Sequence, residues 1–273
     1  MRVGISTASL FNRYELEDCP PHLAALGVGL CELFLNTFSE YREDFIGTLK
    51  RRLDENNLAV YSVHPMGTQY EPQLFSIHHR QREDALKIFT AVLAAARTLG
   101  ARCYVMHGPS SLGGVAKNME MTRLGPIAQE LCELAASYGV TLAWENVSWC
   151  LFHTPEFGLR LLEATRADDL RFTLDVKQAA RSGYSPLAFV DAVGERLVNL
   201  HLCDYRLLPD GRSVPMMPGQ GECDFCALKR ALLEKGYGGP AFLEVYSDMY
   251  KTEAELLESL LYIKNCFTLP GEA

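Results

Sequence analysis

The stretch Thr141-Leu-Ala-Trp-Glu145 is a short apolar run that ends in a possible metal ligand, and three more runs of the chain end in a carboxylate or an imidazole. Each run has the length and residue types of a buried β-strand, and loop residues and a helical pattern follow each one. The other three runs are Phe172-Thr-Leu-Asp175, Leu197-Val-Asn-Leu-His201 and Ala241-Phe-Leu-Glu244. In a parallel sheet built from such βα units, we expect the four polar side chains to meet at one rim.

The same alternation extends through the N-terminal half of the chain. Four more strands are predicted there, at Val3–Ser6, Leu30–Leu35, Ala59–His64 and Cys103–His107. Helical patterns separate the strands, at Pro21–Leu26, Tyr41–Asn56, Arg80–Leu99, Met121–Tyr138, Pro155–Thr165, Pro186–Val193, Asp224–Lys235 and Glu253–Cys266. Eight βα units joined by right-handed crossovers can close into a ring. The predicted fold class is therefore α/β, as a single (β/α)₈ TIM barrel.

No Pro/Gly/Ser-rich linker and no block of charge divides the 273 residues, so we expect one domain over residues 1–273. The longest irregular segment is Arg206–Asp224, which follows the seventh predicted strand. A long loop after a barrel strand is typical of a substrate loop or lid, and a plain surface turn is the alternative.

Composition and charge exclude several classes of protein. A net charge of −8 argues against a general nucleic-acid binder, because phosphate binding requires clustered Lys and Arg. No apolar run approaches the roughly 18 residues of a membrane helix, and the N-terminus does not have the pattern of a signal peptide. The nine cysteines are scattered and odd in number, which indicates reduced thiols and a cytoplasmic protein.

Three carboxylates and one imidazole at a shared rim suit a divalent metal ion. Buried carboxylates must be paired, protonated or metal-bound, and the apolar residues before Glu145 and Glu244 predict burial. Oxygen-rich ligand sets favour hard cations such as Mn²⁺ or Mg²⁺. Acidic residues at strand ends can also cap the next helix, and Asp175 could instead pair with Lys177. The predicted metal ligands are Glu145, Asp175, His201 and Glu244.

An ordered set of motifs resembles the xylose isomerase-like TIM barrel superfamily of sugar phosphate isomerases and epimerases. The motifs are Trp144-Glu-Asn146, Leu174-Asp-Val-Lys-Gln178, Asn199-Leu-His-Leu-Cys-Asp204, Pro218-Gly-Gln-Gly221 and Phe242-Leu-Glu-Val-Tyr246. The resemblance implies that the four predicted ligands hold one catalytic divalent ion, with Mn²⁺ preferred and Mg²⁺, Co²⁺ or Zn²⁺ as alternatives. It also implies that Glu145 and Glu244 exchange a proton with the substrate on opposite faces.

The implied reaction is isomerisation or epimerisation of a keto-sugar or polyol through an enediolate. A cation polarises the carbonyl and acidifies the neighbouring C–H, and either glutamate can then act as the base. The expected partner is a small sugar, with no nucleic acid and no membrane, and a homodimer or homotetramer is plausible.

Seven further residues near the strand ends are predicted to contact substrate. His64 and His107 end the third and fourth strands, and structural histidines are the alternative for both. Lys177, Asp204 and Arg206 have solvation or a surface ion pair as their alternatives. The full predicted set is His64, His107, Asn146, Lys177, Gln178, Asp204 and Arg206.

Three other functions remain open on the same scaffold. A lyase or dehydratase, similar to inosose dehydratases or to C-glycoside-cleaving enzymes, would begin with the same proton abstraction. A phosphodiesterase similar to endonuclease IV is disfavoured, because Gln178 stands where a further histidine is expected and Ser213-Val-Pro-Met-Met217 lacks the expected Asp/His pair. The third possibility is a non-catalytic sugar-binding barrel.

Overall fold

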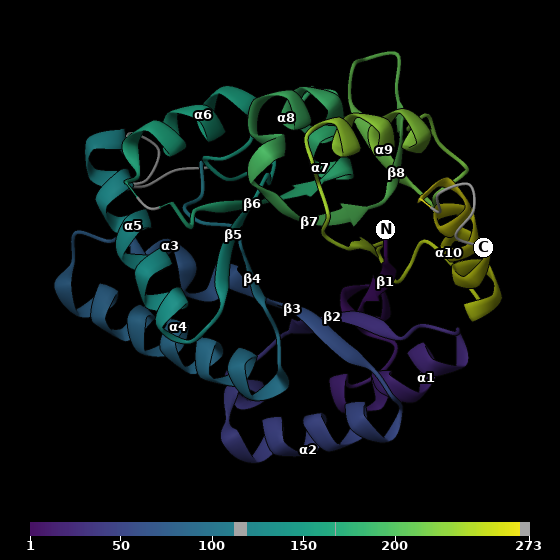
Figure 1. Ribbon diagram of the computed structural model, residues 1–273, viewed down its shortest axis with the longest axis horizontal. Coiled ribbons are helices and arrows are strands. Elements are labelled where there is room, and N and C mark those ends of the chain that lie inside the picture. The colour runs from purple at the N-terminus through teal and green to yellow at the C-terminus, as the bar shows by residue number, and fades with distance from the viewer. Residues whose placement is uncertain (112–118, 167, 268–273) are drawn as a thin grey trace.

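Eight parallel strands close into a barrel in the computed structural model, which describes residues 1–111, 119–166 and 168–267. Around the ring the strand order is β1-β10-β7-β6-β5-β4-β3-β2. Each barrel strand therefore pairs with the next barrel strand in the chain, and the last one, β10, pairs with β1. Figure 1 shows the strands in the centre with the helices packed around them. The predicted (β/α)₈ TIM barrel is confirmed.

All eight predicted strands are present, and their ends differ from the prediction by at most one residue. The barrel strands are β1 (Val3–Ser6), β2 (Leu30–Leu35), β3 (Ala59–Pro65), β4 (Cys103–Met106), β5 (Thr141–Glu145), β6 (Arg171–Asp175), β7 (Leu197–Leu202) and β10 (Ala241–Leu243).

The eight predicted helices are also present, and two short helices, α3 and α7, are additional. The helices are α1 (Cys19–Ala25), α2 (Glu43–Glu55), α3 (Glu71–Leu74), α4 (His79–Leu99), α5 (Met121–Ser137), α6 (Pro155–Ala164), α7 (Val176–Arg181), α8 (Pro186–Val193), α9 (Phe225–Glu234) and α10 (Glu253–Phe267). Their ends follow local signals: Thr154 accepts the N–H of Phe157 at the start of α6, and Gly100 ends α4 with φ 76°. Within the described ranges, no helix is both long and apolar enough to cross a membrane.

The segment that was predicted to be irregular, Arg206–Asp224, contains most of an antiparallel hairpin. Strand β8 (Asp204–Leu207) pairs with β9 (Ser213–Met216), and Gly211 takes a φ of 84° in the turn between them. The prediction was wrong because both strands are only four residues long and mostly accessible to solvent. Their sequences therefore do not alternate between apolar and polar residues in the way that marks a strand. Pro215 within β9 further obscures the strand signal.

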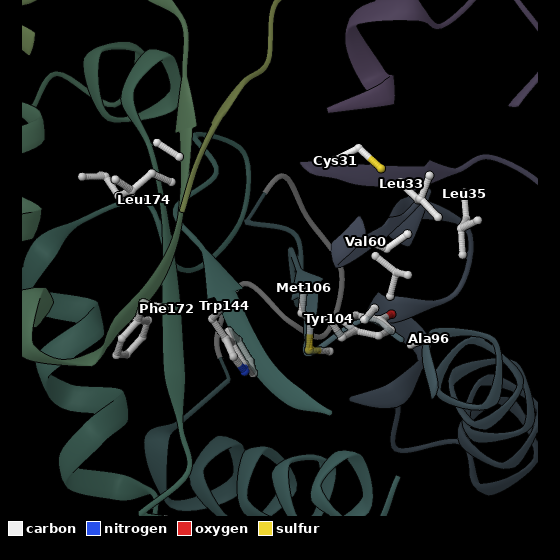
Figure 2. Close-up of a cluster of buried hydrophobic side chains, with 14 of the residues drawn as sticks. Cys31, Leu33, Leu35, Val60, Ala96, Tyr104, Met106, Trp144, Phe172 and Leu174 are labelled. Atoms are coloured by element: carbon white, nitrogen blue, oxygen red, sulfur yellow. The ribbon is translucent and has the colours of Figure 1, made fainter. Parts of the chain in front are cut away.

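Alternate side chains of the barrel strands face two different environments. The outward side chains pack under the helices in one large core. Figure 2 shows part of that core, including Cys31, Leu33 and Leu35 of β2, Tyr104 and Met106 of β4, Trp144 of β5, and Phe172 and Leu174 of β6. Inside the barrel, a small separate cluster contains Cys103, Val105 and Ala143. Because side chains alternate along a strand, Glu145 faces inward with Ala143, at the C-terminal rim.

We predict that Gly125→Ala destabilises the protein by about 1–3 kcal/mol, the usual range for overpacking. A Cβ at this position of α5 would collide with the carbonyl oxygen of Ala164, at the end of α6. The measurement is the free energy of unfolding in urea.

The matched control is Gly47→Ala, at an exposed position of α2 where a Cβ meets nothing within 4 Å. Helix propensity alone should stabilise this variant by roughly 0.5–1 kcal/mol. Equal effects of the two substitutions would contradict the close packing of α5 on α6.

Candidate metal centre

The side chains of Glu145, Asp175, His201 and Glu244 converge at the C-terminal rim of the barrel. One ligand atom from each lies within 4.8 Å of the others. The imidazole of His201 is at the centre, with Nδ1 2.8 Å from Glu145 Oε1 and 2.5 Å from Glu244 Oε2. Strands β5, β6 and β7 supply the first three residues, and the fourth directly follows β10.

Asp175 is held by both its side chain and its backbone. It is the N-cap of α7, where Oδ1 accepts the N–H of Gln178 at 2.8 Å. The Asn146 side chain accepts the N–H of Asp175 at 2.7 Å and donates to its carbonyl at 2.9 Å. These contacts leave Oδ2 to face the centre, 2.5 Å from the ammonium of Lys177.

Burial and neighbouring charge shift the pKa values of the three carboxylates in different directions. Burial opposes ionisation of Glu145, but the charges and hydrogen bonds of His201, His107 and His64 together outweigh burial and keep the pKa of Glu145 well below its ordinary value. The same balance lowers the pKa of Glu244 to about 2. For Asp175 burial prevails over the attraction of Lys177 and raises its pKa to about 6. The raised pKa indicates that negative charge at Asp175 is only partly compensated by the side chains around it.

The donor set fits a divalent metal ion. Oε2 of Glu145 and Oε2 of Glu244 are buried, and the histidine nitrogens that lie 2.9 Å and 2.5 Å from them do not have the geometry of a hydrogen bond. Such oxygens need a partner, and a cation close to them would also favour the ionised form of Asp175. Carboxylate oxygens with one imidazole nitrogen form a ligand set common to Mn²⁺, Zn²⁺ and related ions.

Lys177 is a buried cation at the edge of this centre, with 3% of its side chain exposed. Its ammonium is 3.3 Å from Glu244 Oε1, in addition to its contact with Asp175. Burial opposes the charged form, but the two carboxylates outweigh burial, so the pKa of Lys177 lies well above its ordinary value. The ammonium therefore stays charged at neutral pH.

His64 and His107 form a second group of nitrogen donors that shares Glu145. Their Nε2 atoms are 2.8 Å apart, and Nε2 of His107 is 2.9 Å from Glu145 Oε2. The buried carboxylate of Glu71 accepts the backbone N–H of His107 at 2.8 Å and that of Gly108 at 3.1 Å. Glu71 thereby holds the end of β4 so that the His107 ring faces the centre.

A cavity of about 320 Å³ opens above these side chains. Its floor is polar, formed by His64, His107, Glu145, Asp175, Lys177, Gln178 and Glu244. Its walls are largely apolar and aromatic, formed by Ala8, Phe11, Phe34, Met66, Val147, Trp149, Val245 and Tyr246. A polar floor below aromatic walls is an arrangement that suits a small polyhydroxylated ligand.

Three of the residues predicted to contact substrate do not line this cavity. Asn146 is buried, and its amide is used by the Asp175 backbone. Arg206 is exposed and donates to the carbonyl of Gln220 at 3.0 Å. The carboxylate of Asp204 accepts four backbone N–H groups, those of Tyr205, Gly219, Gly221 and Cys223, at 2.8–3.1 Å. These contacts indicate that Asp204 holds the loop that carries the hairpin.

The strand-end pattern does not identify Glu32, which lies in the middle of β2 and is fully buried. Both of its carboxylate oxygens are 3.0 Å from Nε2 of His201. The available signal was a single charged residue inside the apolar run Leu30-Cys-Glu-Leu-Phe-Leu35, because a charge in such a strand requires a buried partner.

Comparison with known proteins yields one family and several distant relatives. The family model described as "Xylose isomerase-like TIM barrel" matches residues 21–266. An uncharacterised protein of Mycobacterium leprae is 24% identical over 97% of each chain. Inosose isomerase of Bacillus velezensis is 25% identical over 61% of this chain and 62% of its own length. For 3-dehydroshikimate dehydratase of Pseudomonas aeruginosa, the identity is 28% over 50% of this chain and 23% of that protein.

Solved structures with the same fold cover nearly the whole chain. D-Psicose 3-epimerase from Clostridium cellulolyticum H10, crystallised with D-tagatose, superimposes with a TM-score of 0.79 at 17% identity, over 98% of this chain and 100% of the other. The IolI protein with a bound zinc atom also has a TM-score of 0.79, at 20% identity, over 97% of this chain and 96% of the other.

We predict that Asp204→Asn destabilises the protein by about 1–3 kcal/mol, because an amide group replaces an oxygen that accepts backbone N–H groups. Amide hydrogen exchange over residues 204–224 should accelerate, while the metal content stays unchanged. The measurements are urea unfolding and hydrogen exchange with mass spectrometry.

Asp210→Asn is the matched control, since Asp210 is exposed in the same hairpin and should change stability by less than about 0.5 kcal/mol. An Asp204→Asn protein of normal stability and weaker substrate binding would instead assign Asp204 a direct contact with substrate.

Proposed function

The chain belongs to the xylose isomerase-like TIM barrel family, and from this premise we propose that it is a divalent-metal-dependent isomerase or epimerase of a small keto-sugar or polyol. The observation that carries the proposal is that Glu145 and Glu244 line one cavity and flank the same imidazole nitrogen of His201. In the ring of strands, β5 and β10 stand three places apart, so the two carboxylates reach the cavity from different sides.

Two carboxylates on different sides of a substrate can exchange a proton with inversion. When bound by Glu145, Asp175, His201 and Glu244, a divalent metal ion supplies Lewis acidity that polarises a substrate carbonyl and acidifies the adjacent C–H. One glutamate removes that proton, and the other returns a proton to the opposite face of the same carbon. Both side chains are largely shielded from water, with 2% and 13% exposed, which favours proton transfer to substrate over exchange with solvent.

The other residues of the cavity floor would hold and orient the substrate. His64 and His107 offer imidazole nitrogens next to Glu145, and Lys177 offers a charged donor next to Glu244. Gln178 lines the cavity while its amide oxygen accepts the Ser148 hydroxyl at 2.8 Å, which fixes the amide group. Hydroxyl groups of a sugar can pair with all of these side chains. The D-psicose 3-epimerase fold and the inosose isomerase relative support a substrate of this chemical class.

A dehydratase is the second candidate, and the position of Lys177 favours it. A buried ammonium that faces the cavity can give a proton to the departing hydroxyl, which leaves as water, after a glutamate has removed the neighbouring proton. The 3-dehydroshikimate dehydratase relative supports this alternative over half of the chain. Mass spectrometry of the product separates the two reactions, because an epimerase conserves the mass and a dehydratase removes one water.

We predict that protein purified without added metal, or incubated with Mn²⁺ or Zn²⁺, contains about one equivalent of divalent ion. His201→Ala should lose most of this metal, because it removes the central nitrogen ligand. The measurement is elemental mass spectrometry of desalted protein.

Glu40→Gln is the control, since it removes a different buried carboxylate that accepts N–H groups of its own loop, at Asn36 and Thr37. This variant should keep the metal. Wild-type protein that binds no divalent ion under any of these conditions would contradict metal dependence and would favour a sugar-binding barrel.

We further predict that Glu145→Gln and Glu244→Gln each slow the exchange of a substrate C–H with deuterated water by about 10²–10⁴-fold. A glutamine amide can neither accept the proton nor return it. Proton NMR of 2-ketohexoses and inososes in D₂O measures the exchange.

The exposed Glu133→Gln on α5 is the control and should exchange at the wild-type rate. Undiminished exchange in both cavity variants, each folded and loaded with metal, would rule out the two-glutamate mechanism.

A further inference from the structure

A polar layer lies inside the barrel, just below the candidate metal centre. Barrel interiors are usually filled by branched apolar side chains. Here the layer contains Glu32, Ser62, Thr173 and Asn199, all with 0% exposure. The strand pairing skips Tyr61 between β2 and β3 and Val198 between β6 and β7, and these shifts place Ser62 and Asn199 in register with Glu32 and Thr173. Burying a carboxylate at this depth is costly unless it is fully paired.

Glu32 receives hydrogen bonds from two other strands. Its Oε2 accepts from the Ser62 hydroxyl at 2.7 Å and from the Asn199 amide at 2.9 Å. Nε2 of His201 is 3.0 Å from each carboxylate oxygen. The only nearby ring nitrogen of His64, Nδ1, is 3.7 Å from Oε1, which is beyond hydrogen-bond distance. The carboxylate therefore acts on His201 directly and on His64 only through its charge.

The two ring nitrogens of His201 consequently face different partners. An ionised carboxylate only accepts hydrogen bonds, so the nitrogen next to Glu32 must carry the proton. Nδ1 points toward Glu145 and Glu244, where the other ligand atoms converge. A metal ion held by these carboxylates would replace the proton on Nδ1, whereas Nε2, which faces Glu32, would keep its own. Glu32 does not line the cavity, so it has no contact with a substrate held there.

We propose that Glu32 is a positioning residue that keeps His201 in the Nε2–H tautomer and thereby directs Nδ1 to the divalent metal ion. This inference rests on the metal-dependent function proposed above, but it concerns the ligand atom and its orientation rather than the reaction. Partners of this kind typically change metal affinity 10–100-fold when they are replaced.

The first test uses the wild-type protein labelled with ¹⁵N-histidine and loaded with ¹¹³Cd²⁺ as a spectroscopic substitute. We expect a one-bond ¹¹³Cd–¹⁵N coupling to Nδ1 of His201 and a directly bonded proton on Nε2, assigned by comparison with His201→Ala. Coupling to Nε2 would overturn the inference and leave the proposed function intact. Failure of the protein to bind any divalent ion would overturn both.

The second test measures metal affinity in Glu32→Gln, which keeps the volume of the side chain but places an NH₂ group among hydrogen-bond donors. We expect the Kd for Zn²⁺, measured by competition with a chelator, to rise about 10–100-fold. The ¹⁵N spectrum should lose the single Nε2–H tautomer of His201. The control Glu40→Gln should leave the Kd and the spectrum unchanged.

A folded Glu32→Gln protein with wild-type Kd and an unchanged His201 spectrum would overturn the inference, since it would reduce Glu32 to a structural role. If Glu32→Gln does not fold, the cadmium coupling in the wild-type protein still decides which nitrogen binds.

Discussion

The structure depends on the burial of His201 among carboxylates inside the barrel. Its Nε2 faces Glu32, and its Nδ1 faces Glu145 and Glu244. Charges removed from water cost several kcal/mol each unless opposite charge and hydrogen bonds replace the lost hydration. The imidazole supplies part of that compensation, and its own pKa lies well above the ordinary value because these carboxylates outweigh the effect of burial.

The remaining polar contacts of the centre follow from this constraint. One carboxylate oxygen of Asp175 caps α7, and the other forms an ion pair with Lys177. The side chain of Asn146 accepts the backbone N–H of Asp175. A bound divalent ion would add positive charge where carboxylates crowd, so it would stabilise the folded state over the unfolded state by mass action. The same crowding that weakens the barrel in isolation thus gives it affinity for a cation. Large outward-facing residues, such as Tyr104 and Trp144, supply the apolar burial that offsets this cost.

Much of the fold could be predicted from the sequence because barrel strands and surface helices follow different hydrophobic periods. The short elements could not: α7 begins directly after β6 at Asp175, and the β8–β9 hairpin has four-residue strands without an apolar face. The strand-end pattern also identified the four side chains that converge at the rim, although their binding of metal stays a prediction. It did not identify Glu32, which lies within a strand and meets His201 from the far side of the barrel.

By itself, the sequence determined the alternation of strands and helices and which polar residues end the strands, since both depend on local spacing. Only the tertiary structure decided what those polar residues contact. Asn146 follows Glu145 directly, and its side chain forms hydrogen bonds with the backbone of Asp175. Asp204 lies three residues after His201, and its carboxylate accepts backbone N–H groups between residues 205 and 223. Closure of the ring and the shifts in strand register set which side chains meet across the barrel. The side chains that meet there come from residues far apart in the chain, so no local sequence pattern predicts these contacts.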